Sequence, residues 1–118
     1  MKNTDRKIKV LLADDHLVVR MGLAAIISLE KDMTVVAEAS DGFEAVRLAA
    51  EKDPDVIVMD LMMPKLDGAQ ATAKIKAADP SAEILILTTF GGAIGVKRAL
   101  DAGARSALVK TTSQPDLI

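Results

Sequence analysis

Aromatic side chains are scarce in this sequence and cysteine is absent. The chain contains no cysteine, tryptophan or tyrosine, and its two aromatic residues are Phe43 and Phe90. Without cysteine, neither a disulfide framework nor a thiolate metal site can form. Half of the residues are nevertheless hydrophobic. The core must therefore consist of aliphatic side chains and methionine, which suits helices packed on a sheet.

Clustered positive charge and long apolar segments are missing as well. The net charge is −2, and the lysines near the start, such as Lys2 and Lys9, are scattered. Nucleic-acid binding by this chain alone is disfavoured, because contacts to phosphate groups need a clustered positive face. No apolar run reaches the length of a membrane span, and no signal peptide is recognisable. We therefore expect a soluble, cytoplasmic domain without membrane contact.

Apolar runs and helical spacings alternate along the chain, whose 118 residues fit one domain. Repeating units of about 25 residues predict right-handed βαβ crossovers and a parallel sheet. The unbroken apolar run before Asp60 predicts a strand buried on both faces, whereas Glu38 interrupts its strand and suits a sheet edge. The predicted strands are residues 8–13, 34–39, 56–60, 83–87 and 106–109, and the predicted helices span about 16–29, 43–50, 69–78 and 93–100.

The last residues carry signals for a helix that the chain does not complete. Ser113, Pro115 and Asp116 have the chemistry of a helix start, and the chain stops at Ile118. We therefore expect a truncated fifth helix and a chain that is a fragment of a longer protein. A doubly wound sheet needs helices on both faces. An apolar patch of the sheet and the first helix should then be left uncovered, or be covered by a partner.

Polar residues stand at the ends of four predicted strands. Asp14 and Asp15 end the first, Asp60 the third, Thr88 the fourth and Lys110 the fifth. In a parallel sheet these ends share one edge, which is where open α/β sheets bind ligands. Three converging carboxylates repel one another, and a hard cation such as Mg²⁺ relieves that repulsion. A hydroxyl and an ammonium suit the oxygens of a transferred phosphoryl group. The residues thus predict a Mg²⁺-assisted phosphoryl acceptor, with Asp60 as the nucleophile.

The sequence resembles the receiver domain of bacterial two-component response regulators. The resemblance covers nearly the whole chain and rests on these strand-end residues and on the loop from Asp60 through Pro64 to Gly68. It implies a CheY-like, flavodoxin-like, doubly wound sheet of five parallel strands in the order 2-1-3-4-5. The runs around His16 and Phe90 resemble the branch that usually carries a LuxR-type helix-turn-helix domain. Residues 1–118 would then form a receiver domain without an output domain in this chain.

The resemblance also implies partners and a role for each residue of the site. The donor would be the phosphohistidine of a sensor histidine kinase, and DNA would be bound only through an output domain absent from this chain. Phosphorylation would shift the population between two states. The implied roles are phosphoryl acceptor for Asp60, direct Mg²⁺ ligand for Asp15, Mg²⁺ ligand through water for Asp14, ligand through its backbone carbonyl for Met62, and contacts to the phosphoryl group for Thr88 and Lys110.

Two stretches depart from the family's pattern. The family usually has an aromatic residue on strand five that rotates inward, and Ala107 stands at that position. The loop after Phe90, usually acidic, is rich in glycine from Gly91 to Gly95. Glycine inside a helix costs about 0.5–1 kcal/mol relative to alanine, so we expect the fourth helix to begin short or mobile. Output, including a homodimer, is therefore expected through the first-helix/fifth-helix face.

Other interpretations of the same residues remain open. Asp14 and Asp15 could cap a helix. For His16 the sequence favours the role of a surface or capping residue over that of a base. A receiver-shaped module that no longer uses phosphate would fit the departure at Ala107. A Mg²⁺-dependent phosphatase would need a second carboxylate where Met62 stands. We expect a phosphoacceptor rather than an enzyme, capable at most of self-phosphorylation and slow autodephosphorylation.

Overall fold

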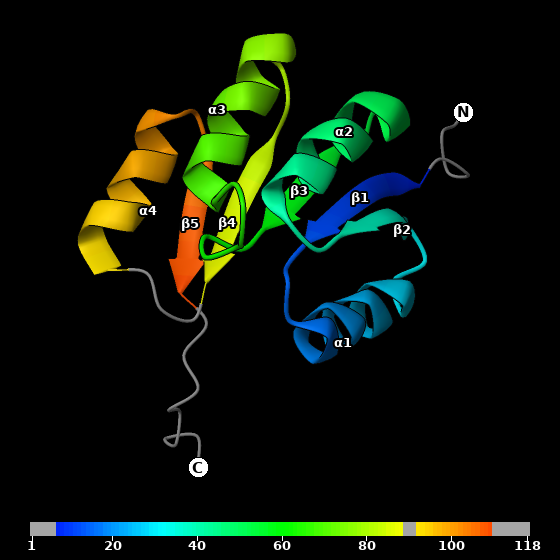
Figure 1. The fold of residues 1–118 in the computed structure, drawn as a ribbon. Coiled ribbons are helices and arrows are strands. Elements are labelled where there is room, and N and C mark those ends of the chain that lie inside the picture. The colour runs from blue at the N-terminus through cyan, green and yellow to red at the C-terminus, as the bar shows by residue number, and fades with distance from the viewer. Residues whose placement is uncertain (1–6, 89–91, 110–118) are drawn as a thin grey trace.

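The computed structural model describes residues 7–88 and 92–109, and in this part of the chain strands and helices alternate (Figure 1). The predicted fifth helix, from Ser113 onward, lies outside the described residues. In chain order the elements are β1 (Ile8–Ala13), α1 (Leu17–Ser28), β2 (Met33–Ala39), α2 (Gly42–Lys52), β3 (Val56–Met59), α3 (Gly68–Ala78), β4 (Ile84–Thr88), α4 (Gly92–Asp101) and β5 (Ser106–Val109).

The strands form one parallel sheet in the order β2-β1-β3-β4-β5, which confirms the predicted topology. β2, with its exposed Glu38, lies at an edge of the sheet as expected. Right-handed crossovers place helices according to the direction in which the chain moves across the sheet. The crossover from β1 to β2 runs toward one edge of the sheet, whereas the crossovers from β2 to β3, from β3 to β4 and from β4 to β5 run toward the other edge. Consequently α2, α3 and α4 lie side by side on one face, and α1 lies on the opposite face (Figure 1).

The strands β3 and β4 are fully buried on one face only, whereas Val10–Ala13 of β1 are buried on both faces. Side chains alternate between the two faces of a strand. Along β3, Ile57 and Met59 are buried, whereas Val56 and Val58 are half-buried. β4 has the same alternation. The prediction that the strand before Asp60 is buried on both faces is therefore wrong. Within the described residues, α1 is the one helix on the second face, and it packs against β1 and β2.

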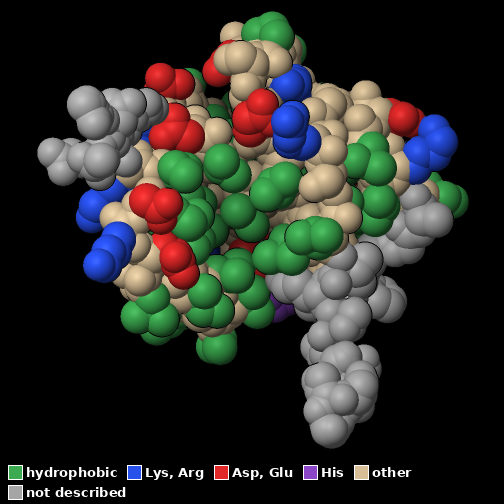
Figure 2. Space-filling model, turned by 180° about the vertical axis from the view of Figure 1, so that it is seen from behind, with side chains coloured by type: hydrophobic (Ala, Val, Ile, Leu, Met, Phe, Trp, Pro, Cys, Tyr) green, Lys and Arg blue, Asp and Glu red, His purple; other side chains and the backbone are tan. Residues whose placement is uncertain are grey.

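The helix α1 exposes much of its apolar surface. None of its residues is buried, although most of them are hydrophobic. Val18 is 81% exposed and Ile26 is 62% exposed. Figure 2 shows the molecule from behind, with hydrophobic side chains gathered across this face. For the described residues this confirms the expected uncovered apolar patch.

The fourth helix does not begin short, and the other expectation, a mobile start, stays a prediction. α4 starts at Gly92 and continues for 10 residues. A Cβ atom at Gly95 would lie 2.8 Å from Cδ2 of Leu61, in the loop after β3. The absence of a side chain at Gly95 thus lets the helix approach that loop closely. The close approach of α4 to that loop therefore favours glycine here, although glycine inside a helix is unfavourable by propensity.

Candidate functional site

The two most buried carboxylates of the site are fixed by the sheet itself. The backbone N–H of Asp60, the first residue after β3, donates to the carbonyl of Ala13 at 2.8 Å. The N–H of Asp14, the first residue after β1, donates to the carbonyl of Ala39 at 3.0 Å. Sheet pairing therefore continues one residue past each strand. It sets Asp14 and Asp60 side by side at the carboxyl edge, only 3% and 5% exposed.

The loop that follows Asp60 is held close to the site by a glycine. Gly68 opens α3, and its N–H donates to the carbonyl of Leu61 at 2.8 Å. A Cβ atom at Gly68 would overlap the carbonyl oxygen of Asp60 and would lie 2.8 Å from Cα of Leu61. Asp67 and Gln70 form a capping box at the same helix start. The sequence from Asp60 to Gly68 thus closes a tight loop over the edge of the sheet.

Four potential metal ligands converge at this edge. Asp14, Asp15, His16 and Asp60 each offer a ligand atom, and these atoms all lie within 4.8 Å of one another. Burying carboxylates is costly unless positive charge or hydrogen-bond donors compensate them. Carboxylate oxygens are the ligands that Mg²⁺ prefers. The donor set therefore fits a divalent cation, and the structure brings together the three predicted aspartates.

The side chain of His16 faces these carboxylates. Its ring Nδ1 lies 3.0 Å from Oδ1 of Asp14 and 3.3 Å from Oδ1 of Asp15. The hydrogen bond to Asp14, followed by the negative charges of Asp15 and Asp14, raises the pKa of His16 above 6.5. His16 stands at the N-cap of α1 and its side chain is 64% exposed, which agrees with the expected surface or capping residue, although the side chain itself makes no capping bond. In the sequence, the position of His16 directly after two aspartates was the sign that its ring could lie beside their carboxylates.

Arg20 is a second residue of the site that the sequence did not indicate. Its Nη1 donates to the backbone carbonyl of Asp14 at 2.7 Å, and its Nε donates to Glu38 at 2.9 Å. The guanidinium thus ties α1 to β2 and to the turn that carries the aspartates. A lone arginine on a predicted helix gives no sign of this contact.

The remaining predicted residues are placed less fully. Thr88 ends β4, pairs with Val109 of β5 and is 1% exposed, so it lies at the carboxyl edge as predicted. The side chain of Met62 is 56% exposed, and the role predicted for its carbonyl stays a prediction. Lys110 lies outside the described residues. The structure therefore unites the acidic part of the predicted site and leaves the roles of these three residues as predictions.

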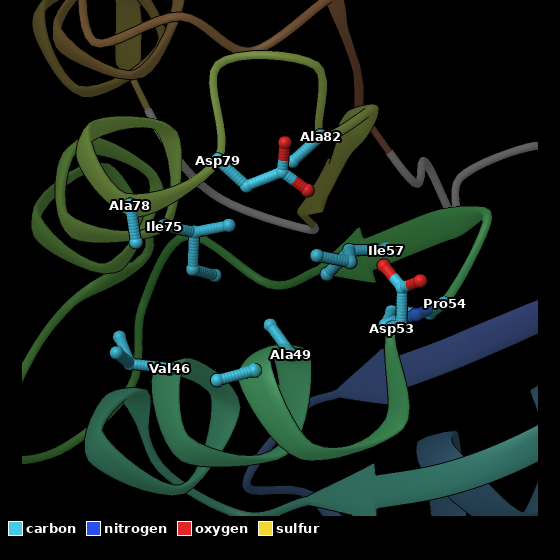
Figure 3. A pocket seen from close by; sticks show the side chains of 10 residues that line it. Val46, Ala49, Asp53, Pro54, Ile57, Ile75, Ala78, Asp79 and Ala82 are labelled. Atoms are coloured by element: carbon cyan, nitrogen blue, oxygen red, sulfur yellow. The ribbon is translucent and has the colours of Figure 1, made fainter.

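A separate hollow lies at the opposite, amino-terminal edge of the sheet (Figure 3). It has a volume of about 280 Å³ and lies between α2 and α3. Val46, Ala49, Ile57 and Ile75 point into it, and carboxylates stand at its rim. The side chains that line it are apolar or acidic, so none of them offers a phosphoryl group a positive charge. The acidic edge, where potential metal ligands converge, therefore fits phosphoryl chemistry better than this hollow does.

Comparisons with known proteins agree with this geometry. The family model described as "Response regulator receiver domain" matches residues 10–118. Response regulator protein VraR of Staphylococcus aureus is 46% identical over 110 residues, which cover 93% of this chain and 53% of that protein. A LuxR-family two-component response regulator from Aurantimonas sp. SI85-9A1 is 39% identical, with a TM-score of 0.85 over 94% of this chain and 79% of that one.

A third comparison concerns a structure with a bound cation. The CheX-CheY-BeF3-Mg²⁺ complex from Borrelia burgdorferi contains a chain 26% identical to this one, with a TM-score of 0.83. The match covers 95% of this chain and 84% of that chain. The chain spans about half the length of the curated relatives that it matches. Among the described helices, none combines the length and the apolar character that crossing a membrane requires.

Proposed function

Because the chain belongs to the family of response regulator receiver domains, we propose that Asp60 accepts a phosphoryl group with the help of a bound Mg²⁺. Phosphorylation of an aspartate is the function of this family. The observation that carries the assignment to Asp60 is its placement, 5% exposed and beside Asp14 and Asp15, at the carboxyl edge of the sheet. An aspartate in that position stands beside the potential metal ligands at the edge of the sheet where ligands of this fold bind.

The acidic cluster would hold the cation through oxygen atoms. We assign Asp15 as a direct ligand, Asp14 as a ligand through water, and Asp60 and the carbonyl of Met62 as the remaining protein ligands. The Mg²⁺ in the CheY complex from Borrelia burgdorferi supports this choice of cation. A bound Mg²⁺ supplies positive charge that neutralises the phosphoryl oxygens.

The chain's own residues then carry the transfer. An Asp60 carboxylate oxygen attacks phosphorus and forms the new O–P bond, while the N–P bond of the donor phosphohistidine breaks. The electron pair of that bond leaves with the imidazole of the donor. The Thr88 hydroxyl donates a hydrogen bond to a phosphoryl oxygen, and the Lys110 ammonium pairs with the transferred charge. Met62 stands where a phosphatase would need a second carboxylate, so catalysis stops at self-phosphorylation and slow autodephosphorylation.

The partners follow from this role. The donor is a sensor histidine kinase, and the protein is cytoplasmic. A longer protein of which residues 1–118 form the receiver domain would bind DNA through a LuxR-type output domain, as the Aurantimonas relative suggests. Signalling would use the face formed by α1 and a fifth helix, because Ala107 replaces the switching aromatic residue. The exposed apolar surface of α1 supports a homodimer through the same face.

Intact mass spectrometry tests the phosphoryl transfer. The protein is incubated with acetyl phosphate and Mg²⁺, beside an Asp60→Asn variant and a sample without metal. A gain of one phosphoryl group in the wild type, absent from both controls, is expected. No gain in a folded protein that binds Mg²⁺ would instead favour a receiver-shaped module that works without phosphate.

A further inference from the structure

The imidazole of His16 reaches all three carboxylates of the acidic cluster. Its Nδ1 atom lies 3.0 Å from Asp14 Oδ1, 3.3 Å from Asp15 Oδ1 and 3.9 Å from Asp60 Oδ2. If the ring served only to make a hydrogen bond to Asp14, its nitrogen would need to lie close to that one carboxylate. Here a single nitrogen approaches oxygen atoms from two different strand ends. The ring therefore shares the space in which the carboxylates would hold a cation.

The backbone around His16 aims the ring at this space. Its N–H donates to Asp14 Oδ1 at 2.8 Å, which closes a short turn between the two residues. Arg20 holds the carbonyl of Asp14 at 2.7 Å, so the turn is fixed from the other side. The helix does not use the ring, because His16 makes no side-chain capping bond although it stands at the N-cap.

The separations of these atoms suit one coordination shell. In an octahedral shell with ligands about 2.1 Å from the metal, neighbouring ligand atoms lie about 3.0 Å apart and opposite ones about 4.2 Å. The three distances from His16 Nδ1 fall between 3.0 and 3.9 Å. The side chain is also 64% exposed, so its ring is free of the core packing that would oppose small adjustments. One cation could therefore contact the ring nitrogen and the carboxylates together.

We propose that His16 is an additional, nitrogen ligand of this site, which makes the site a binder of first-row transition cations as well as of Mg²⁺. Oxygen ligands suit Mg²⁺ and Mn²⁺, whereas an imidazole nitrogen suits later first-row cations such as Ni²⁺, Cu²⁺ and Zn²⁺. The inference rests on the proposed function in one respect, because it takes the three aspartates as the metal ligands. It adds a residue that determines which cation the site prefers.

Two measurements on untagged protein test this assignment. His16 is the chain's single histidine and the chain has no cysteine, so one substitution removes every imidazole and no thiolate competes. Pulsed electron paramagnetic resonance of bound Mn²⁺ should show coupling to an imidazole nitrogen in the wild type and none in His16→Gln. Isothermal titration should show Ni²⁺ affinity falling about tenfold or more in His16→Gln and His16→Ala, with Mg²⁺ affinity changing far less.

The outcomes separate this inference from the proposed function. Glutamine can still donate a hydrogen bond to Asp14, so a ring that merely supports that carboxylate would leave the ratio of Ni²⁺ to Mg²⁺ affinity unchanged in His16→Gln. That result, or Mn²⁺ bound without nitrogen coupling, would overturn the inference while the magnesium site stands. If Asp60→Asn weakened the binding of neither Mg²⁺ nor Ni²⁺, or if the wild type bound neither cation, the metal site and the inference would fail together. Circular dichroism confirms that the variants are folded.

Discussion

The carboxylate of Asp41 stabilises the start of α2. It accepts a hydrogen bond from the N–H of Glu44 at 2.8 Å, and that bond is the main reason why the pKa of Asp41 lies below its usual 3.8, with the charge of Lys65 adding to it. We predict that Asp41→Ala lowers the free energy of unfolding by about 1 kcal/mol at neutral pH. Urea unfolding followed by circular dichroism measures this loss.

The same contact should depend on pH in a defined direction. A carboxyl group whose pKa is lowered in the folded state contributes stability above its unfolded pKa, and that contribution disappears as the pH falls through the folded value. The difference between wild type and Asp41→Ala should therefore shrink below about pH 4. Asp41→Asn, which keeps a capping oxygen without a charge, serves as the control. A difference of the same size at pH 7 and pH 3 would contradict this account.

Gly68 and Gly22 should respond oppositely to alanine. A Cβ atom at Gly68 would overlap the backbone of Asp60, whereas a Cβ at Gly22 in α1 would meet nothing within 4 Å. We predict that Gly68→Ala destabilises the protein by about 1–3 kcal/mol, because backbone must move. Gly22→Ala should stabilise it by about 0.5–1 kcal/mol through helix propensity. Thermal unfolding compares the two variants, and a neutral Gly68→Ala would show that the loop is looser than described.

The strand-end residues could be predicted from sequence, but their surroundings could not. An apolar run followed by a carboxylate places Asp14 and Asp60 at a sheet edge whatever the details of packing. The direction of the His16 ring depends instead on a turn that Asp14 closes with its own side chain. The contacts of Arg20 depend on the approach of α1 to β2. Both arise from tertiary structure, which a local pattern does not carry.

The hollow between α2 and α3 gives a prediction about how these helices pack. Ala77 and Ala78 are both exposed, but Ala78 lines the hollow and Ala77 does not. A leucine at position 78 should extend into the apolar space and bury surface that water now contacts. We predict that Ala78→Leu is more stable than the matched Ala77→Leu by about 0.5–1 kcal/mol in urea unfolding. Equal stabilities would show that the hollow does not accept the side chain.

The burial of β3 shows why one prediction about the elements failed, and α4 shows how packing acts beside propensity. The apolar run of β3 correctly gives a strand, but the same run occurs whether one face or two are covered. Whether the second face of β3 is buried depends on which helices cover it. Gly95 correctly signals poor helix propensity, yet α4 continues through it and lies so close to Leu61 that a Cβ atom would need the neighbour to move. Propensity is local, and packing against a distant loop overrides it.

Across the whole molecule, the exposed apolar surface of α1 predicts self-association through one face. Ile26 on α1 is 62% exposed, and Ile94 on α4, on the other side of the sheet, is 78% exposed. We predict that Ile26→Glu weakens self-association about tenfold or more, since a charge in an apolar contact is costly. Ile94→Glu, a matched change, should leave it unaffected. Sedimentation velocity over a range of concentrations measures both, and equal behaviour of the two variants would contradict the α1 face.

The position of the phosphoryl group is the central claim, and chemical trapping locates it most directly. Borohydride reduces an aspartyl phosphate to homoserine, which is stable to proteolysis and can be placed by tandem mass spectrometry. After treatment with acetyl phosphate and Mg²⁺, homoserine is expected at position 60 and nowhere else. It should disappear when Mg²⁺ is removed. Homoserine at position 14 or 15, or a phosphoryl group on His16 with Asp60 unmodified, would contradict the account.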